Sequence, residues 1–560
     1  MKAKKPVGKR IACVLALALV CGALAACSGD GGGDDSSGSA VGDKTLIVGE
    51  SGFAGKFMPI MHESAVDSRI DSLVFEPLMQ NNESGEFLPW LAETMDVSED
   101  GLELTFTLKD GVTFSDGEPL TTADVAFTYE TVANADYDGP RSYIVSDLEG
   151  YEAFHEGTSD EFSGIRVVDE KTIIFVFTEG NASPVNVEFF NFGIMPKHYY
   201  EFETWEEFMG KLSEPLGSGP MILEEYKPKQ HVKLSANANY WDSANAPKLS
   251  GVLIQEVPSE TMLGALQTGQ VLLGSLESTE ENVAALDAIA DVEYFISPVN
   301  GYNFLYFNCV NGIFEDARVR RALTYGLDRE SFIQTEFGGY VERGLGPITP
   351  VSWAGTEEGM NTYDFDPAKA EELLKQAGWI KGADGILEKD GKKFSIRFLV
   401  NSDAAWTGTL ANLAADSWKQ LGVDLRIEQM DQSSVISATV GAEPGEKDFD
   451  VATLGITLGV DPDPSGGVFD YDAYSAGGLC ASGYLNERAQ ELLKLGKEEF
   501  DQAKRKEYYQ EWSRLMNQEV PTMLLNYRNT LWGINQNVTG LRISAYTNWT
   551  YRITEVEIEG

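Results

Sequence analysis

Metal-ligating side chains are scarce in this sequence of 560 residues, which has only four histidines and five cysteines. It contains no Cys-x-x-Cys and no His-x-x-x-His spacing, so a structural zinc site lacks its usual ligands. The four histidines, His62, His155, His198 and His231, stand singly in the chain. We therefore expect no bound metal and no cofactor.

Catalytic patterns are also lacking. There is no Gly-x-Ser-x-Gly elbow, no Walker loop and no His-Glu-x-x-His pair. Nothing in the sequence joins a nucleophile to a base, so we expect a protein that is not an enzyme. Because the chain has many carboxylates, a catalytic pair like that of a glycosidase stays an open alternative. Only the separation of two carboxylates in space identifies such a pair.

Positive charge is in short supply. Lys and Arg number 43 against 88 Asp and Glu, a net charge of −45, and so acidic a surface repels the phosphate backbone of a nucleic acid. Hydrophobic residues make up 43% and aromatic residues 11% of the chain, which is a globular composition and far from that of disorder. The composition thus excludes nucleic-acid binding and favours a long folded chain.

The N-terminus predicts export. Lys and Arg are concentrated in the first ten residues, and an apolar stretch at 11–26 is too short to span a bilayer comfortably. Leu24-Ala-Ala-Cys27 resembles the bacterial lipobox, so 1–26 is predicted to be a lipoprotein signal peptide and Cys27 a lipid anchor. An ordinary signal peptide is the alternative. Residues 27–43, rich in Gly, Ser and Asp, are predicted to be a flexible tether.

Only two cysteines follow Cys27, namely Cys309 and Cys480. A disulfide between them is possible in an oxidising compartment, but the sequence cannot show whether their Cβ atoms approach. This pairing stays open.

Strand-like and helix-like patterns alternate after residue 44, which indicates an α/β fold. Leu104, Phe106 and Leu108 alternate with polar residues as in a half-buried strand, and 172–177 is a second strand candidate. Capping signals predict a helix at 366–378, between an Asp-Pro start and a Gly stop. A helix at 410–421 precedes a strand at 423–427.

Two further patterns are interpreted as structural. Aromatic residues recur at helical spacing over 508–516, which is typical of a core-facing helix. Asp461, Asp463, Ser465 and Asp472 imitate the spacing of a calcium loop, but two prolines and the lack of a preceding helix favour a proline-rich turn.

One long block, residues 104–125 (LTFTLKDGVTFSDGEPLTTADV), resembles the characteristic segment of family 5 solute-binding proteins, the peptide- and nickel-binding components of ABC importers. The similarity extends in family order over 44–560, through 194–198, 217–220, 239–241, 314–323, 366–379 and Pro521.

The resemblance implies an α/β, two-lobed periplasmic-binding-protein-like fold (type II, large peptide-binding class) with an extra inserted domain. The implied domains are domain I at 44–79, 197–299 and 521–560, domain II at 80–196, and domain III at 300–520. The chain crossings near Val299 and Pro521 would form the hinge. Closure about such a hinge buries the ligand from water.

The ligand is where this sequence departs from the family pattern. Many peptide-binding members place an Asp against the peptide's α-ammonium, ten residues beyond a Phe-Asp-Val strand start. Counting from Phe449 leads here to Gly459, so that buried charge partner is missing. Asp461 or Asp463 could substitute only if a proline-restricted loop shifts.

Candidate ligand contacts follow from the resemblance by position alone: Gly52, Phe53, Arg141, Tyr143, Met430, Gly455, Ile456, Thr457 and Gly459. Met430 and Ile456 stand where tryptophans often line the cleft. Arg141 suits a bidentate carboxylate, although a solvated loop charge is the alternative.

The function implied is an extracytoplasmic receptor on the outer face of the cell membrane, monomeric and lipid-anchored, that delivers a solute to ABC permease and ATPase subunits. A peptide is the first candidate solute. An oligosaccharide or similar non-peptide solute is the alternative, and a cell-surface hydrolase the third hypothesis.

Overall fold

The computed structural model describes residues 44–178, 187–499 and 501–559. The predicted signal peptide, the anchor residue Cys27 and the tether lie outside the described residues. Their assignment therefore stays a prediction.

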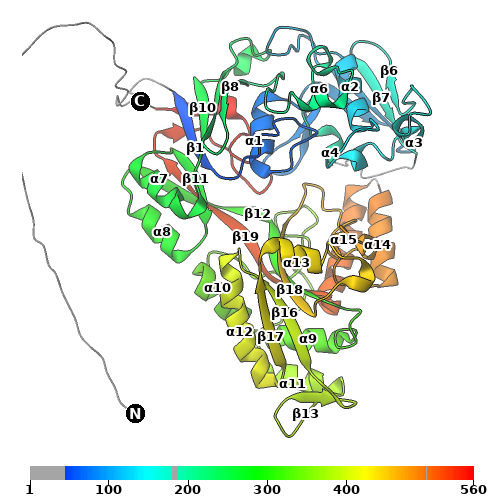
Figure 1. Ribbon diagram of the computed structural model, residues 1–560, viewed down its shortest axis with the longest axis vertical. Helices are drawn as coiled ribbons and strands as arrows, with labels where there is room; N and C mark the ends of the chain where they lie inside the picture. The colour runs from blue at the N-terminus through cyan, green and yellow to red at the C-terminus, as the bar shows by residue number, and fades with distance from the viewer. Residues whose placement is uncertain (1–43, 179–186, 500, 560) are drawn as a thin grey trace, which may run out of the picture. The chain divides into compact units, whose positions relative to one another are not determined.

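A ten-stranded mixed sheet is the largest element of the described chain (Figure 1). Its strands are, in spatial order, β17 (Asp424–Met430), β16 (Ser395–Asn401), β18 (Val451–Thr457), β12 (Val292–Phe307), β19 (Thr522–Asn535), β11 (Leu273–Glu277), β1 (Thr45–Glu50), β10 (Gly251–Glu256), β9 (His231–Ala236) and β8 (Met221–Lys227).

The two long strands β12 and β19 connect the halves of this sheet. The first part of β12 pairs with the second part of β19, which also pairs with β11. The second part of β12 pairs with the first part of β19 and with β18. The β12–β19 register shifts between Pro298 and Tyr302, so the ladder is irregular where the two strands pass from one half to the other.

Separate hydrophobic cores lie on the two sides of this crossing. One cluster draws its buried residues from Leu46 to Leu273 and from Trp532 to Val556, and we call this part the first lobe. Two further clusters draw theirs from Tyr302 to Tyr527, and this part is the second lobe. The predicted two-lobed α/β fold is confirmed, whereas the predicted domain boundaries and hinge positions stay predictions.

The long family-like block forms part of the first lobe. It contains β5 (Glu103–Leu108), in a four-stranded antiparallel sheet with β4 (Ala92–Val97), β7 (Thr172–Val176) and β6 (Ile165–Val167), followed by α2 (Thr122–Val132). Thr121 and Asp124 form a capping box at the start of α2. Asp124 also accepts a hydrogen bond from the Lys197 backbone N–H (2.9 Å), which ties two motifs together.

The other helices of the described residues are α1 (Ala65–Val74), α3 (Tyr151–His155), α4 (Val187–Phe190), α5 (Lys197–Tyr200), α6 (Trp205–Met209), α7 (Met262–Thr268), α8 (Glu280–Asp287), α9 (Ala317–Tyr325), α10 (Arg329–Phe337), α11 (Pro367–Gln376), α12 (Ala405–Leu421), α13 (Gln432–Ala438), α14 (Glu487–Glu498) and α15 (Gln502–Glu519). The short strands are β2 (Met79–Asn81), β3 (Phe87–Pro89), β13 (Ile380–Lys381), β14 (Leu387–Lys389), β15 (Lys392–Lys393), β20 (Val538–Thr539) and β21 (Glu557–Ile558).

The helices predicted from local signals are confirmed. Asp366 caps α11 by accepting from the Lys369 N–H, and Gly422 ends α12 in the left-handed conformation, with β17 following directly. In α15 the side chains of Tyr509 and Trp512 are buried in the core of the second lobe. The aromatic stripe is therefore structural, as its spacing predicts.

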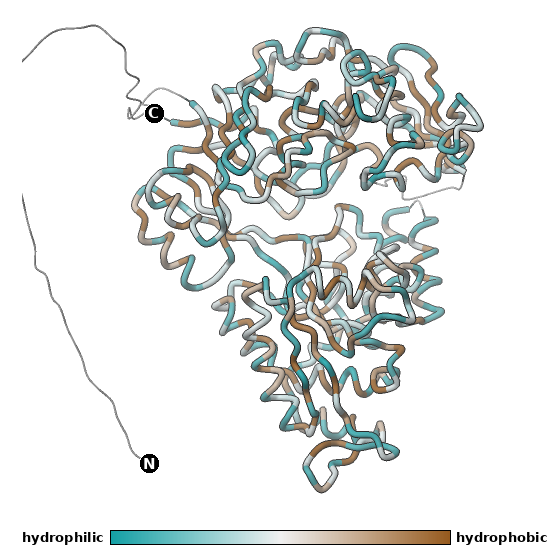
Figure 2. The backbone as a smooth tube through the Cα atoms, viewed as in Figure 1, coloured by the Kyte–Doolittle hydropathy of each residue, from teal (hydrophilic) through white to brown (hydrophobic). Residues whose placement is uncertain are grey.

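Hydrophilic and hydrophobic positions are interspersed along the chain, as Figure 2 shows. Among the helices of the described residues, none has the length and apolar character needed to cross a membrane.

Candidate functional site

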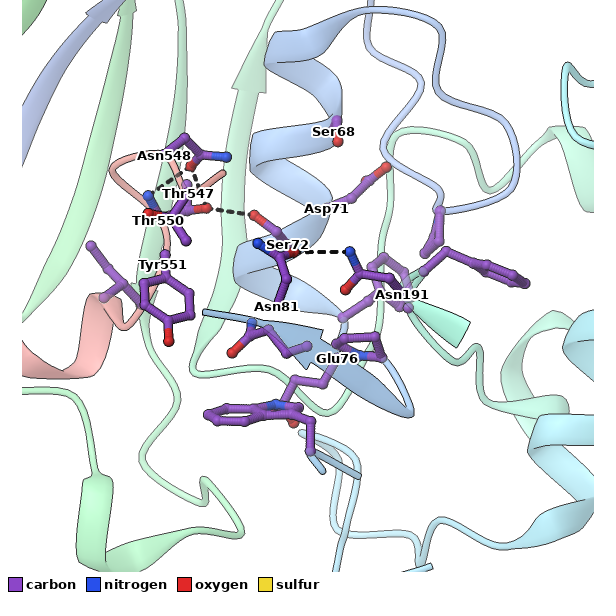
Figure 3. A pocket seen from close by; sticks show the side chains of 18 of the residues that line it. Ser68, Asp71, Ser72, Glu76, Asn81, Asn191, Thr547, Asn548, Thr550 and Tyr551 are labelled. Carbon is purple, nitrogen blue, oxygen red and sulfur yellow. Dashed lines mark hydrogen bonds between the residues drawn. The ribbon is translucent and has the colours of Figure 1, made fainter. Parts of the chain in front are cut away.

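A cavity of about 420 Å³ lies against α1 in the first lobe (Figure 3). Its wall is formed by one face of α1, by the chain around Asn191, by residues 546–554 near the C-terminus and, from the second lobe, by Val460. The volume is within the range of small-molecule binding pockets. The cavity is therefore the place to look for a ligand site.

One face of α1 supplies polar groups to this cavity. Ser64 caps the helix by accepting from the Asp67 N–H, and Ser68, Asp71 and Ser72 follow at i, i+3 and i+4 spacing on the cavity side. The Ser72 hydroxyl is hydrogen-bonded to that of Thr550 (2.8 Å), which ties the helix to the C-terminal segment (Figure 3).

Asp71 is a buried acid with one oxygen unused. Its Oδ2 lies 2.6 Å from His62 Nδ1, while Oδ1 has no hydrogen-bond partner in the described structure. Only 4% of the residue is exposed. Burial, and next the nearby Asp67, raise the pKa of Asp71 well above its usual range.

His62 links this acid to the predicted ligand residue Arg141. An Arg141 Nη2–H faces His62 Nε2, and Arg141 Nη1 donates to the His62 carbonyl (2.9 Å). Since a guanidinium only donates, His62 Nε2 accepts and Nδ1 carries the proton given to Asp71. Burial and the Arg141 charge lower the pKa of His62 to about 3, which keeps the ring neutral at physiological pH.

Glu76 lies just beyond the end of α1 and is saturated with donors. Its Oε1 accepts from Trp90 Nε1 (3.0 Å) and the Tyr240 hydroxyl (2.6 Å), and its Oε2 accepts from Trp241 Nε1 (2.6 Å) and the Ser218 hydroxyl (2.9 Å). Two of the family-like segments, 217–220 and 239–241, thus meet at this carboxylate. Its role is to hold the cavity floor together.

Arg552 adds a cation to the cavity wall. Its guanidinium lies 4.7 Å from the ring centroid of Trp90 and 5.7 Å from that of Tyr551, and among the described residues it makes no hydrogen bond or ion pair. Its backbone φ is +53°, a left-handed conformation that is uncommon for an arginine. The arginine is therefore held by ring stacking with its N–H groups unused.

The second lobe touches the first at the edge of the cavity. A Cβ atom at Gly85 would lie 3.2 Å from Val460 Cγ1 and 3.2 Å from the Tyr546 ring. Gly85 has a positive φ of 79°, so this close approach depends on glycine.

The structure brings only part of the predicted contact set to this cavity. Arg141 and Tyr143 line it. Gly52 and Phe53 do not: the Gly52 N–H donates to Glu256 (3.0 Å), and the buried Phe53 ring packs against Tyr226.

The predicted second-lobe residues lie on and after β17 and β18 and do not line this cavity. Gly455, Ile456 and Thr457 pair with β12, and Met430 ends β17. The Gly459 carbonyl accepts from Asn300 Nδ2 (2.6 Å), one residue before the cavity-lining Val460. As ligand contacts, all nine residues stay predictions.

Asp461 is engaged in a buried ion pair. Both its oxygens accept from the Arg505 guanidinium, at 2.9 and 3.1 Å, and the two side chains are 13% and 6% exposed. It also accepts from the Asp463 N–H (2.9 Å), which stabilises the turn. In this conformation Asp461 is not available to a ligand ammonium.

Cys309 and Cys480 are both buried free thiols, so no disulfide joins them in this structure.

Sequence reasoning missed His62, Asp71, Glu76 and Arg552. The pattern Ser68, Asp71, Ser72 on one helical face is a signal for the cavity side of α1. The stacking of Arg552 on Trp90 has no local signal, because the two residues are far apart in the chain.

Two lobes joined by crossing strands, with a polar cavity at their edge, are the architecture of a solute-binding protein. The family model of bacterial extracellular solute-binding proteins, family 5, matches residues 86–477, and the chain belongs to this family.

Relatives resemble the chain over nearly its whole length. The oligopeptide-binding protein AppA of Bacillus subtilis is 26% identical over 556 residues, which cover 97% of both chains. Its structure in complex with a nonapeptide superposes with a TM-score of 0.75 and 25% identity, covering 92% of this chain and 99% of that one. The ABC transporter substrate-binding protein CtaP of Listeria monocytogenes, at 24% identity and a TM-score of 0.79, shares the fold over 92% of this chain and 99% of its own.

Proposed function

We propose that this protein is the peptide-binding receptor of an ABC importer. It captures a peptide by closure of its two lobes and delivers it to the permease. The observation that carries the proposal is the end-to-end similarity to an oligopeptide-binding protein, whose structure was solved with a nonapeptide. The polar cavity beside the lobe crossing provides a place for such a ligand.

The crossing strands support a closing motion. The register shift between Pro298 and Tyr302 interrupts the β12–β19 ladder, so the pairing of these two strands is weakest where they pass from one lobe to the other. Ligand binding shifts the open and closed populations by its differential affinity for them. The permease would recognise the closed form. No catalytic step is needed for this role.

The receptor is proposed to be monomeric and held outside the cell by lipid on Cys27. The anchor is supported by the lipobox-like Leu24-Ala-Ala-Cys27 and by the Gly/Ser/Asp tether that follows it. After removal of 1–26 the chain carries 38 positive and 88 negative charges, a net charge of −50. Such a body is repelled by anionic lipid, so acyl chains must supply the membrane affinity.

Native mass spectrometry of the purified full-length protein tests the ligand class. We expect bound species with peptide masses that fragment into amino-acid series. Bound species that fragment into hexose units would show instead a receptor for an oligosaccharide.

A further inference from the structure

We propose that the cavity beside α1 receives a zwitterionic ligand, with its ammonium group at Asp71 Oδ1 and its carboxylate at the Arg552 guanidinium. This inference rests on the proposed function and assigns the residues that distinguish the two ends of a short peptide.

Asp71 is the buried acid of this cavity whose hydrogen bonding is incomplete. Among the described residues, Asp71 Oδ1 is the only carboxylate oxygen that is buried without a partner. The other buried acid of the cavity, Glu76, has all four of its hydrogen bonds made. A buried polar atom without a partner costs free energy, and a ligand N–H would remove that cost.

The charges around Asp71 favour a cation. His62 is neutral, because its pKa is lowered to about 3, and Arg141 donates to His62 through both its Nη atoms. Asp67 lies near enough to raise the pKa of Asp71. The Arg141 guanidinium also lies near enough to Asp71 to act on its pKa in the opposite direction, and a ligand ammonium at Asp71 Oδ1 would stabilise the charged form of that acid.

The opposite charge is available at Arg552. Trp90 holds two cations, the Arg552 guanidinium at 4.7 Å and Lys109 Nζ at 5.7 Å from its ring centroid. Among the described residues the Arg552 guanidinium makes no ion pair, although Glu83 lies near enough to interact with its charge. Its planar N–H fork fits a carboxylate with two hydrogen bonds. Its left-handed backbone conformation, with φ of +53°, is a cost that a binding role would explain.

Contacts connect the two ends of this site. Trp90, under Arg552, donates to Glu76, which lies five residues after Asp71 along the α1 segment. Asp71 and Arg552 both line the cavity, and the hydrogen-bonded hydroxyls of Ser72 and Thr550 belong to its wall. A ligand with separated opposite charges would span it.

The test uses full-length protein and an equimolar synthetic mixture of tri- to pentapeptides built from Ala, Ser, Leu and Phe. The mixture is prepared with free ends, with N-acetyl ends and with C-terminal amides, so only the terminal charges differ. Apparent affinities are measured by isothermal titration calorimetry. For the wild type, each modification should weaken binding about five- to a hundred-fold.

Two variants assign the ends. Asp71→Asn should bind free and acetylated peptides within about twofold of each other while still discriminating against the amide. Arg552→Gln should do the reverse, since it keeps the apolar stem over Trp90 but loses the charge. Matched controls are Asp96→Asn and Arg426→Gln, which neutralise exposed residues elsewhere and should behave as wild type.

The outcomes separate the inference from the proposed function. If the wild type binds none of the mixtures, the peptide receptor role fails and this inference with it. If the wild type binds free and modified peptides equally, or if each variant keeps the full discrimination of the wild type, the receptor role stands and the assignment of Asp71 and Arg552 is overturned. The comparison of peptide ends on the wild type does not depend on the variants folding.

Discussion

Replacing Glu76 by glutamine should destabilise the first lobe, because the glutamine amide cannot accept all four hydrogen bonds that the Glu76 carboxylate accepts. Each carboxylate oxygen accepts from one indole N–H and one hydroxyl. A glutamine amide turns one of these oxygens into an NH₂ group. A hydroxyl can rotate to accept from it, but an indole N–H cannot. Either orientation of the amide therefore leaves one tryptophan N–H facing a donor.

The magnitude follows from two opposing effects. A buried donor without an acceptor costs about 1–3 kcal/mol. Burial, on the other hand, raises the pKa of Glu76 in spite of its four donors, so removing the charge returns part of that cost. We expect a net loss of about 1–2 kcal/mol in the free energy of unfolding.

Urea denaturation followed by tryptophan fluorescence measures this loss, because Trp90 and Trp241 are among the reporters. Glu99→Gln, at an exposed position, is the matched control and should unfold as the wild type does. A Glu76→Gln variant as stable as the control, or more stable, would refute the reasoning, since it would show that the carboxylate is protonated or that its donors are not needed.

Three further predictions concern stability and anchoring. An unfolded histidine takes up its proton near pH 6.5, whereas folded His62 does so only near pH 3, so the folded state loses stability as the pH falls through this window. The difference in stability between the wild type and His62→Asn, measured by thermal unfolding, should therefore shrink from pH 7 to pH 4. A difference that stays constant would contradict a neutral His62 ring. Asp461→Asn should cost about 3–5 kcal/mol in unfolding free energy because it leaves the buried Arg505 without its partner, whereas a loss below about 1 kcal/mol would mean that the pair is solvated. Cys27→Ser should release the protein into the medium, as cell fractionation and immunoblotting would show, and unchanged membrane retention would contradict lipid anchoring.

Several helices and strands could be predicted from the sequence, because the signals that form them act between residues close together in the chain. Asp366 and Gly422 mark a helix start and a helix end through hydrogen bonds and backbone angles within a few residues. The alternation of Leu104, Phe106 and Leu108 with polar residues likewise predicted the strand β5. The two-lobed fold itself came from the resemblance, since no local pattern specifies that β12 and β19 lie side by side.

The site was less predictable, because its geometry joins distant parts of the chain. Ser72 and Thr550 are separated by 478 positions and yet share a hydrogen bond. Arg141 was expected in a ligand site and does line the cavity, but the partners that define its environment come from α1 and the loop before it. The role of Gly459 at the ligand stays a prediction. The unsatisfied Oδ1 of Asp71 could be found only in the folded lobe, because its surroundings come from several parts of the chain.

Capture of a peptide by closure of the two lobes can be measured by small-angle X-ray scattering with and without ligand. The full-length protein is measured alone and with a saturating amount of the free-ended peptide mixture. We expect a smaller radius of gyration in the presence of peptide, because the lobes would rotate toward each other about the β12–β19 crossing. Identical scattering curves at concentrations where calorimetry shows full binding would contradict closure and indicate a rigid binder.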